Sequence, residues 1–167
     1  PEDKAAELSA LLKPFSALSV RERRGQALLR RAAGREAQVV LDPTLLLTGA
    51  QWEALAAAPG RKEPYILCYF VSEPGETVPY AQELSRRTGW PIVQLAGARR
   101  KIPGAAEVVF DAGPREFLGL FRHAACVVTN SFHGAVFSLQ FQRPFFTSVS
   151  PKERREPAYS RIYNLLS

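Results

Sequence analysis

The chain has 167 residues, of which 46% are hydrophobic and 23% charged, a balance typical of a folded globular domain and not of a disordered one. It has no apolar run of the roughly 20 residues that a membrane-spanning helix needs, and no signal-peptide pattern. The net charge of +6 suits nucleic acid, an anionic membrane or a phosphorylated ligand. Because the basic residues fall in short clusters without interleaved aromatics, nucleic acid is disfavoured. No methionine is present, so we expect a fragment of a longer protein.

The cysteines and histidines give no sign of a disulfide framework or a metal site. Cys68 and Cys126 each lie in an apolar, strand-like run, which predicts free and buried thiols. His123 and His133 have no cysteine or acidic partners at the spacing of metal ligands, so we expect no metal. The cytoplasm is the expected location.

The first third of the sequence predicts helices alternating with short strands. In chain order these elements are a helix over residues 3–13, a strand over 17–20, a helix over 23–33, a strand over 38–41, and a helix after Thr48-Gly49 that Pro59-Gly60 ends. Gly34 is the expected C-cap of the second helix, because glycine readily adopts the left-handed conformation found there.

The rest of the sequence continues this alternation. Its predicted elements are strands over residues 65–71, 91–95, 108–110, 126–129 and 144–149, and helices over 79–87, 115–124 and 132–140. The run 65–71 is apolar on both alternating faces, as in a strand covered by helices on both sides of a parallel sheet. Trp52, Phe117, Phe121 and Phe137 recur at helical spacing and are expected in the core.

Such alternation predicts an α/β fold, namely a Rossmann-like doubly wound parallel sheet with helices on both faces. We expect one such domain over residues 1–167, with residues 1–15 as an inter-domain or packing helix. Ligands of these sheets bind beyond the carboxyl ends of the strands. The candidate residues there are Arg21, Asp42, Ser72, Gly97, Asp111, residues 130–133 and residues 150–152. No GxGxxG or GxxxxGK[ST] pattern follows a strand, which excludes the usual dinucleotide and P-loop sites.

The strongest local signal is the junction between the strand over residues 126–129 and the helix over 132–140. Asn130 or Ser131 suits the N-cap of that helix, and the free N–H groups of its first turn suit an anion. Gly134 permits close approach of a ligand or a neighbouring strand. The polar residues could equally serve only as caps, with His133 a hydrogen-bonded core residue. Ser131 and His133 point apart on a helix, which argues against a serine hydrolase dyad.

Residues 129–138, TNSFHGAVFS, closely resemble the TNSFHG signature of bacterial polysaccharide pyruvyl transferases. Further segments resemble other elements of that family in the same order. Residues 18–22 are similar to its SVRE element, 40–46 to its DPTLLL element, 111–118 to its GPxEFL element, and 144–146 to the strand after the histidine helix. The resemblance extends over residues 16–166, and several ordered elements are far more specific than one.

The resemblance implies the C-terminal, donor-binding half of a GT-B-like two-domain enzyme that moves a pyruvyl group from phosphoenolpyruvate onto a sugar. The family's catalytic histidine corresponds to His133, its SVRE arginine to Arg21, and a lysine after the last strand to Lys152. The expected substrate-binding residues around the histidine are Asn130, Ser131, Phe132 and Gly134. Phosphoenolpyruvate is then a substrate, and no cofactor is implied.

The residue types suit this chemistry. A guanidinium such as that of Arg21 and an ammonium such as that of Lys152 can hold the carboxylate and phosphate of phosphoenolpyruvate. Ketal formation protonates the enol carbon, adds sugar hydroxyls to the resulting cation and expels phosphate. His133 is the expected general acid and base, a role typically worth about 10²–10⁴-fold in rate.

The resemblance also implies partners and a setting. The acceptor would be a glycan or lipid-linked sugar of a cell-wall polysaccharide or exopolysaccharide, and the full-length enzyme would work in the cytoplasm or peripherally at the inner face of the membrane. We expect the fragment alone to be inactive, since closing two domains excludes water from such sites.

Two alternatives stay open at this stage. The chain could be the nucleotide-sugar-binding half of a GT-B glycosyltransferase, because the fold does not separate that activity from pyruvyl transfer. It could also be a non-catalytic module of glycan assembly. His133 within SFHG, together with Arg21, favours the pyruvyl transferase.

Overall fold

The computed structural model describes residues 4–58, 60–96, 101–149, 155 and 161–166. The chain divides into two compact units, Pro1–Leu46 and Leu47–Ser167, and each is described by itself below. Within the described ranges, no helix is long and apolar enough to cross a membrane.

The first unit is a βαβ motif preceded by a helix. Helix α1 spans Ala5–Leu12, and helix α2 (Arg23–Ala33) connects strands β1 (Ser19–Val20) and β2 (Gln38–Val39), which pair in parallel. Gly34 ends α2 with a φ of 61°, as the sequence predicted. A 3-10 helix, η2 (Pro43–Leu45), follows β2.

The prediction of one domain over residues 1–167 stays a prediction, and the strands of the chain are distributed over two sheets. Strands β1 and β2 form a two-stranded sheet of their own within the first unit. The sequence pattern indicated where strands lie, but strands of two residues are too short to show which sheet they join. Arg21, which follows β1, therefore does not belong to the strand ends of the larger sheet in the second unit.

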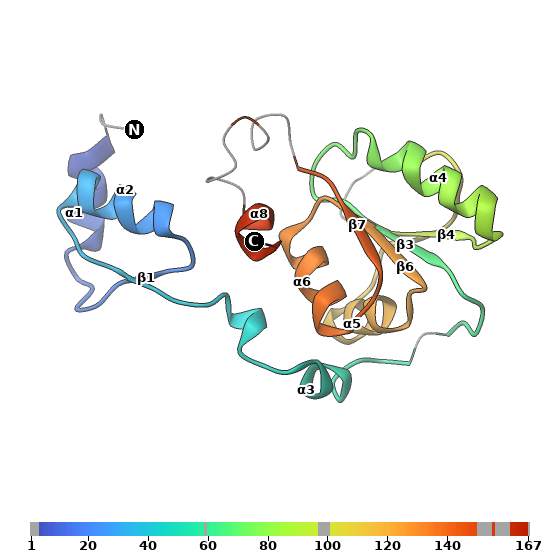
Figure 1. Cartoon of the computed structure of the whole chain (residues 1–167). Coiled ribbons are helices and arrows are strands. Elements are labelled where there is room, and N and C mark those ends of the chain that lie inside the picture. Colours follow the sequence, from blue (N-terminus) through green and yellow to red (C-terminus); the bar gives the residue numbers. More distant parts are fainter. Residues whose placement is uncertain (1–3, 59, 97–100, 150–154, 156–160, 167) are drawn as a thin grey trace. The chain divides into compact units, whose positions relative to one another are not determined.

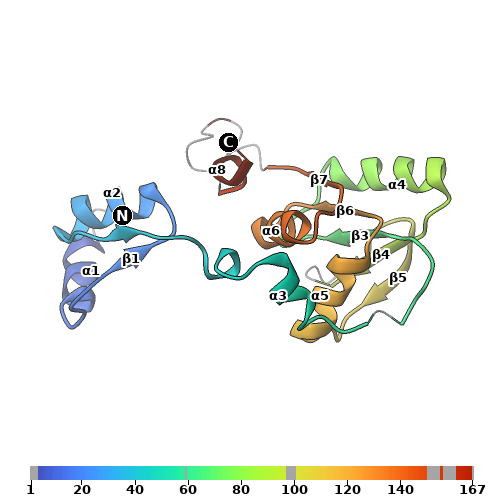
Figure 2. The same cartoon turned by 60° about the horizontal axis from the view of Figure 1, so that its bottom comes forward.

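The second unit contains a five-stranded, wholly parallel sheet in the order β5-β4-β3-β6-β7 (Figure 1; β5 is labelled in Figure 2). Its strands are β3 (Ile66–Tyr69), β4 (Ile92–Leu95), β5 (Ala105–Val109), β6 (Cys126–Thr129) and β7 (Phe145–Thr147). Its helices are α3 (Gly49–Glu53), α4 (Thr77–Thr88), α5 (Pro114–His123), α6 (Phe132–Gln140) and α8 (Arg161–Leu166). The central strand β3 is also the first of this sheet in the chain, and the order reverses beside it, between β3 and β6. Ligands of open α/β sheets bind at such a reversal.

Both faces of this sheet are covered by helices, which confirms the predicted α/β, doubly wound fold class. Leu67 of β3 packs with residues of α5 and α6 in one buried cluster, and Cys68 packs with residues of α4 in another. This alternation follows from the period of two along a strand. Figure 2 shows α4 and α5 on opposite sides of the sheet. Trp52 and Phe117 pack against the first cluster, and Phe121 and Phe137 are buried in it, as predicted.

The predicted elements match the described strands and helices of the second unit closely, apart from helix α8. Strand β6 and helix α6 have the predicted bounds, and both cysteines are free and buried, as expected. Helix α8 was not predicted. Its six residues are too few to show a helical period, although the structure buries Ile162 within it.

Candidate functional site

The candidate site begins where β3 and β6 end side by side. The two strands are parallel, with Tyr69 in register with Thr129. The hydroxyl of Thr129 donates a hydrogen bond to the carbonyl oxygen of Tyr69 at 2.5 Å and accepts one from the backbone N–H of Ser131 at 3.0 Å. Thr129 is fully buried, and its bond with Ser131 is buried with it. The end of β6 is thereby tied to β3 on one side and to the start of α6 on the other.

Ser131 is the N-cap of α6, one of the two candidates that the sequence offered. Its side-chain oxygen accepts a hydrogen bond from the backbone N–H of Gly134 at 3.3 Å, and its backbone has the extended conformation of a cap. The residue is 3% exposed, so its hydroxyl serves the helix and does not project into solvent. The first turn of α6 therefore starts from a fixed point at the carboxyl edge of the sheet.

His133 is the second residue of α6 and is partly exposed. The amino end of a helix carries partial positive charge, because its first N–H groups have no carbonyl partners within the helix. The structure thus places His133 where the sequence predicted, at a position accessible to a ligand.

Phe132 precedes His133 and contacts two other side chains. Its ring centroid is 5.3 Å from that of His133, with an angle of 75° between the ring planes. The guanidinium carbon of Arg161, from α8, lies 4.5 Å from the Phe132 ring centroid. Arg161 was absent from the residues predicted for the site, because no motif marks it.

A glycine is required at position 134 because the side chain of Thr129, at the end of β6, lies so close to the helix. Close approach of a strand was one of the two roles that the sequence left open for Gly134. A Cβ atom built on Gly134 would lie 2.4 Å from the hydroxyl oxygen of Thr129 and 3.1 Å from its Cβ. The histidine helix can approach the end of β6 this closely only with a glycine at that position.

Asn130 holds the loop after β3. Its side-chain oxygen accepts a hydrogen bond from the N–H of Val71 at 3.0 Å, and its amide nitrogen donates to the carbonyl oxygens of Ser72 and Glu73, each at 3.2 Å. These bonds give Asn130 a structural role that the sequence did not predict. Its contact with substrate, like those of Ser131, Phe132 and Gly134, stays a prediction.

Tyr69 is a second residue of this region that the sequence pattern did not reveal. It ends β3 and packs edge to face against Phe117, with ring centroids 5.3 Å apart. Burial raises the pKa of its phenol, and a hydrogen bond with the side chain of Ser131 works in the opposite direction. Within the apolar run 65–71 a tyrosine looks like any core residue, so only the structure connects it with the N-cap.

Arg21 lies in the first unit, where it is bound to Asp42. Its guanidinium forms an ion pair with the Asp42 carboxylate, which also accepts hydrogen bonds from the N–H and hydroxyl of Thr44 at 3.0 and 2.6 Å. Burial alone would raise the pKa of Asp42, but the hydrogen bonds from Thr44 and Arg21 outweigh it and lower that pKa to about 2. The SVRE-like and DPT-like segments are therefore one structural cluster.

The arginine in this cluster keeps access to solvent. The Arg21 side chain is 45% exposed, whereas that of Asp42 is 3% exposed. Asp42, one of the candidate residues after the predicted strands, has a structural role, because its side chain caps η2 by accepting a hydrogen bond from the N–H of Thr44. Lys152, the third predicted cation, lies outside the described residues.

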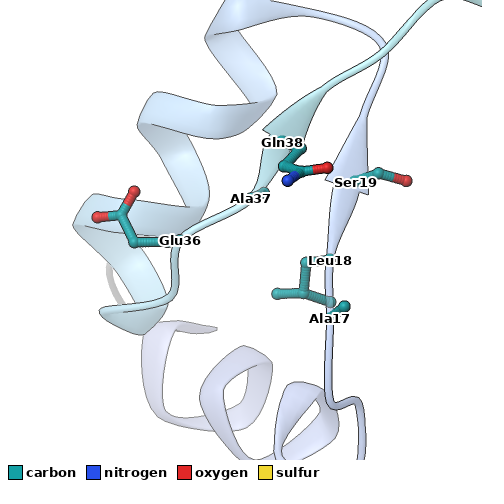
Figure 3. Close-up of a pocket in the computed structure, with 6 residues that line it drawn as sticks. All are labelled: Ala17, Leu18, Ser19, Glu36, Ala37 and Gln38. Atoms are coloured by element: carbon teal, nitrogen blue, oxygen red, sulfur yellow. The ribbon is translucent and has the colours of Figure 1, made fainter.

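The first unit also contains a pocket of about 510 Å³ (Figure 3). It is lined by Ala17, Leu18, Ser19, Glu36, Ala37 and Gln38. These residues lie at or before the starts of β1 and β2, whereas Arg21 follows the end of β1. The pocket includes none of the predicted site residues, so it does not locate the donor.

The fold is an α/β domain of the Rossmann-like class, with a histidine beside the carboxyl ends of β3 and β6. The chain belongs to the polysaccharide pyruvyl transferase family, whose model matches residues 2–152. The family resemblance seen in the sequence is thus confirmed. No curated protein matches the chain.

Similar solved structures are glycosyltransferases. One is the dodecameric iron-containing heptosyltransferase TibC in complex with ADP-D-β-D-heptose, with 20% identity, a TM-score of 0.43, and coverage of 72% of this chain and 34% of that one. Another is TibC from enterotoxigenic E. coli H10407, with 18% identity, a TM-score of 0.40, and coverage of 70% and 34%. The chain thus spans about a third of the length of these proteins.

Proposed function

We propose that this chain binds phosphoenolpyruvate at the amino end of α6 and that His133 moves protons during transfer of the pyruvyl group to a sugar. The observation that carries the proposal is the place of His133. The histidine of the family's SFHG element is partly exposed in the first turn of a helix, at the carboxyl edge of a Rossmann-like sheet.

The reaction needs a group that handles protons. A proton is added to the methylene carbon of phosphoenolpyruvate, and two sugar hydroxyls form bonds to the adjacent carbon. That carbon loses its bond to the phosphate oxygen, the two hydroxyls lose one proton each, and phosphate leaves with one of them. The imidazole of His133 donates and accepts these protons.

The donor is an anion, and the amino end of α6 suits one. The helix dipole and the N–H groups of the first turn stabilise phosphate or carboxylate charge there. We propose Arg21 and Lys152 as further cations for the donor, Arg21 because Asp42 fixes its guanidinium and leaves the side chain 45% exposed. A guanidinium held by one carboxylate still has N–H groups for another acceptor.

The other proposed properties concern the whole protein. They are a GT-B-like second half that supplies the acceptor site, a glycan or lipid-linked sugar as acceptor, and a place in the cytoplasm or at the inner membrane face. We also propose that this chain does not turn over phosphoenolpyruvate without that half, because water is excluded only when such domains close.

A calorimetric titration tests the donor. Phosphoenolpyruvate, pyruvate, inorganic phosphate and two nucleotide sugars would be titrated into the chain and into its His133→Asn and Arg21→Ala variants. We expect saturable binding of phosphoenolpyruvate that both substitutions weaken, and no binding of nucleotide sugars.

The chain offers a matched control in its other histidine. His123 lies at the C-terminal end of α5, away from the first turn of α6, so His123→Asn should bind phosphoenolpyruvate like the wild type. Binding of a nucleotide sugar in place of phosphoenolpyruvate would contradict the proposal. If both histidine variants lost phosphoenolpyruvate binding equally, the proposal that His133 lies at the donor site would be contradicted.

A further inference from the structure

The last residues of three neighbouring strands carry hydroxyl groups. Tyr69 of β3, Thr129 of β6 and Thr147 of β7 are in register, so they form one row at the carboxyl edge of the sheet. Side chains two residues apart on a strand project from the same face. Leu67 and Phe145, two residues before the ends of β3 and β7, pack in the cluster with α5 and α6, so the row lies on the face that these helices cover.

Helix α6 lies over this row. It contacts both β6 and β7 (Figure 1), and a Cβ atom built on Gly134 in its first turn would lie 2.4 Å from the hydroxyl oxygen of Thr129. The backbone N–H of Ser148, the residue after Thr147, donates a hydrogen bond to the carbonyl oxygen of Thr129 at 3.2 Å. Thr147 is therefore the direct neighbour of the residue against which the first turn of α6 packs.

Two of the three hydroxyls have partners, and the third has none. The Thr129 hydroxyl is bonded to Tyr69 and Ser131, and the phenol of Tyr69 is hydrogen-bonded to the side chain of Ser131. The hydroxyl oxygen of Thr147 is buried, yet it has no hydrogen-bond partner among the residues that the structure describes. A buried hydroxyl without a partner destabilises a fold, because it loses its hydrogen bonds to water. The stability of the fold therefore does not account for a hydroxyl at this position.

The Thr147 hydroxyl can turn toward a bound molecule. The residue as a whole is partly exposed, and rotation about its Cα–Cβ bond exchanges the positions of its hydroxyl and methyl groups. No hydrogen bond within the described residues opposes this rotation. The hydroxyl is thus an available donor beside the amino end of α6, where the helix dipole and the N–H groups of the first turn favour an anion.

We infer that Thr147 is a substrate-binding residue, whose hydroxyl donates a hydrogen bond to an anionic oxygen of the molecule bound at the amino end of α6. The identity of that molecule as phosphoenolpyruvate rests on the proposed function, whereas the contact with an anion does not. Phosphoenolpyruvate has such oxygens on both its phosphate and its carboxylate. No motif marks Thr147, because β-branched residues are common in strands.

A calorimetric titration of the chain with phosphoenolpyruvate tests this contact. Thr147→Val keeps the shape of the side chain and removes the hydroxyl, whereas Thr147→Ser keeps the hydroxyl. We expect the valine variant to raise the dissociation constant at least about tenfold, as loss of a hydrogen bond to a charged group does, and the serine variant to stay within about threefold of the wild type. Titrations with inorganic phosphate and with pyruvate show which end of phosphoenolpyruvate meets the hydroxyl, since the ligand that carries that end loses affinity in the valine variant.

Thr88 provides a matched control. It is also a partly exposed threonine, but its hydroxyl donates to the carbonyl oxygen of Leu84 at 2.8 Å and accepts from the N–H of Trp90 at 3.2 Å, at the C-terminal end of α4. Thr88→Val should lower the melting temperature and leave anion binding unchanged, because it removes a hydroxyl that has partners. Thr147→Val should weaken binding without lowering the melting temperature, because it removes a hydroxyl that has none.

The outcomes separate this inference from the proposed function. If phosphoenolpyruvate binds the wild type and Thr147→Val equally well, the inference is wrong and the proposed function stands. A melting temperature that falls in Thr147→Val as far as in Thr88→Val would also overturn the inference, since the hydroxyl would then have a partner in the protein. If phosphate or pyruvate binds through Thr147 but phosphoenolpyruvate does not bind, the anion contact stands and the proposed function fails. No binding of any of the three ligands would contradict both.

Discussion

Replacing Gly134 with alanine tests how closely the histidine helix is fitted to the sheet. The added Cβ would lie 2.4 Å from the Thr129 hydroxyl oxygen and 3.1 Å from both Cβ and Cγ2 of that residue. Thr129 cannot move aside freely, because its hydroxyl bonds to Tyr69 and to Ser131 and the residue is fully buried. The substitution therefore displaces α6 or breaks these bonds.

The expected net effect is a loss of about 2 kcal/mol of unfolding free energy. Overpacking of a tight contact costs about 1–3 kcal/mol, and loss of one hydrogen bond adds about 1 kcal/mol. The higher helix propensity of alanine offsets about 1 kcal/mol of this sum. A stabilised variant would mean that the contact relaxes without strain.

Urea unfolding followed by tryptophan fluorescence measures this change. Both tryptophans, Trp52 and Trp90, belong to the second unit, and Trp52 meets Phe137 of α6 with ring centroids 5.3 Å apart. Gly60→Ala is the control, since a Cβ added at Gly60 would have no other atom within 4 Å, and it should change stability by no more than about 0.5 kcal/mol. Equal stability of the Gly134→Ala and Gly60→Ala variants would show that α6 is not closely fitted to Thr129.

The described contacts support three other predictions. Asn130→Ala should cost about 1 kcal/mol and speed hydrogen exchange at the Val71 amide, which Asn130 binds at 3.0 Å; unchanged protection there would contradict its role. The pKa of Asp42 falls from 3.8 to about 2 on folding, so its contribution to stability is full above about pH 4 and is lost as the pH falls toward 2. Asp42→Asn should therefore flatten the pH dependence of Val40 amide protection in that window, and equal acid sensitivity of both proteins would count against it. Burial raises the pKa of the Cys68 thiol to about 12 and also raises that of Cys126, so neither should react with a thiol reagent near pH 8 until the chain unfolds; rapid labelling of the folded chain would be the opposite result.

The sequence alone predicted the strands of the larger sheet and the start of the histidine helix. The apolar strand that ends at Thr129, the capping residue Ser131 and the apolar helix after it are local signals, and each reads correctly from neighbouring residues alone. The alternation of strands and helices also determined the fold class, because parallel strands require crossover helices between them.

What the sequence could not show are contacts between distant residues. Substrate binding by Asn130 stays a prediction, but the sequence could not show that its side-chain amide is bonded to a loop about 59 positions earlier in the chain. Arg21 looked like a residue at the edge of the larger sheet, but β1, which it follows, pairs with β2 in a separate sheet. Arg161 carried no signal at all, because its contact with Phe132 depends on how α8 packs.

Whether His133 lies at a phosphoenolpyruvate site decides the proposed function, and a ¹H–¹³C NMR titration of the two histidines with phosphoenolpyruvate answers that question. We expect a saturable shift of the His133 ring signal and an unchanged His123 signal, with no response to a nucleotide sugar. A His133 signal that stays in place while phosphoenolpyruvate binds, or one that follows the nucleotide sugar instead, would contradict the proposed function.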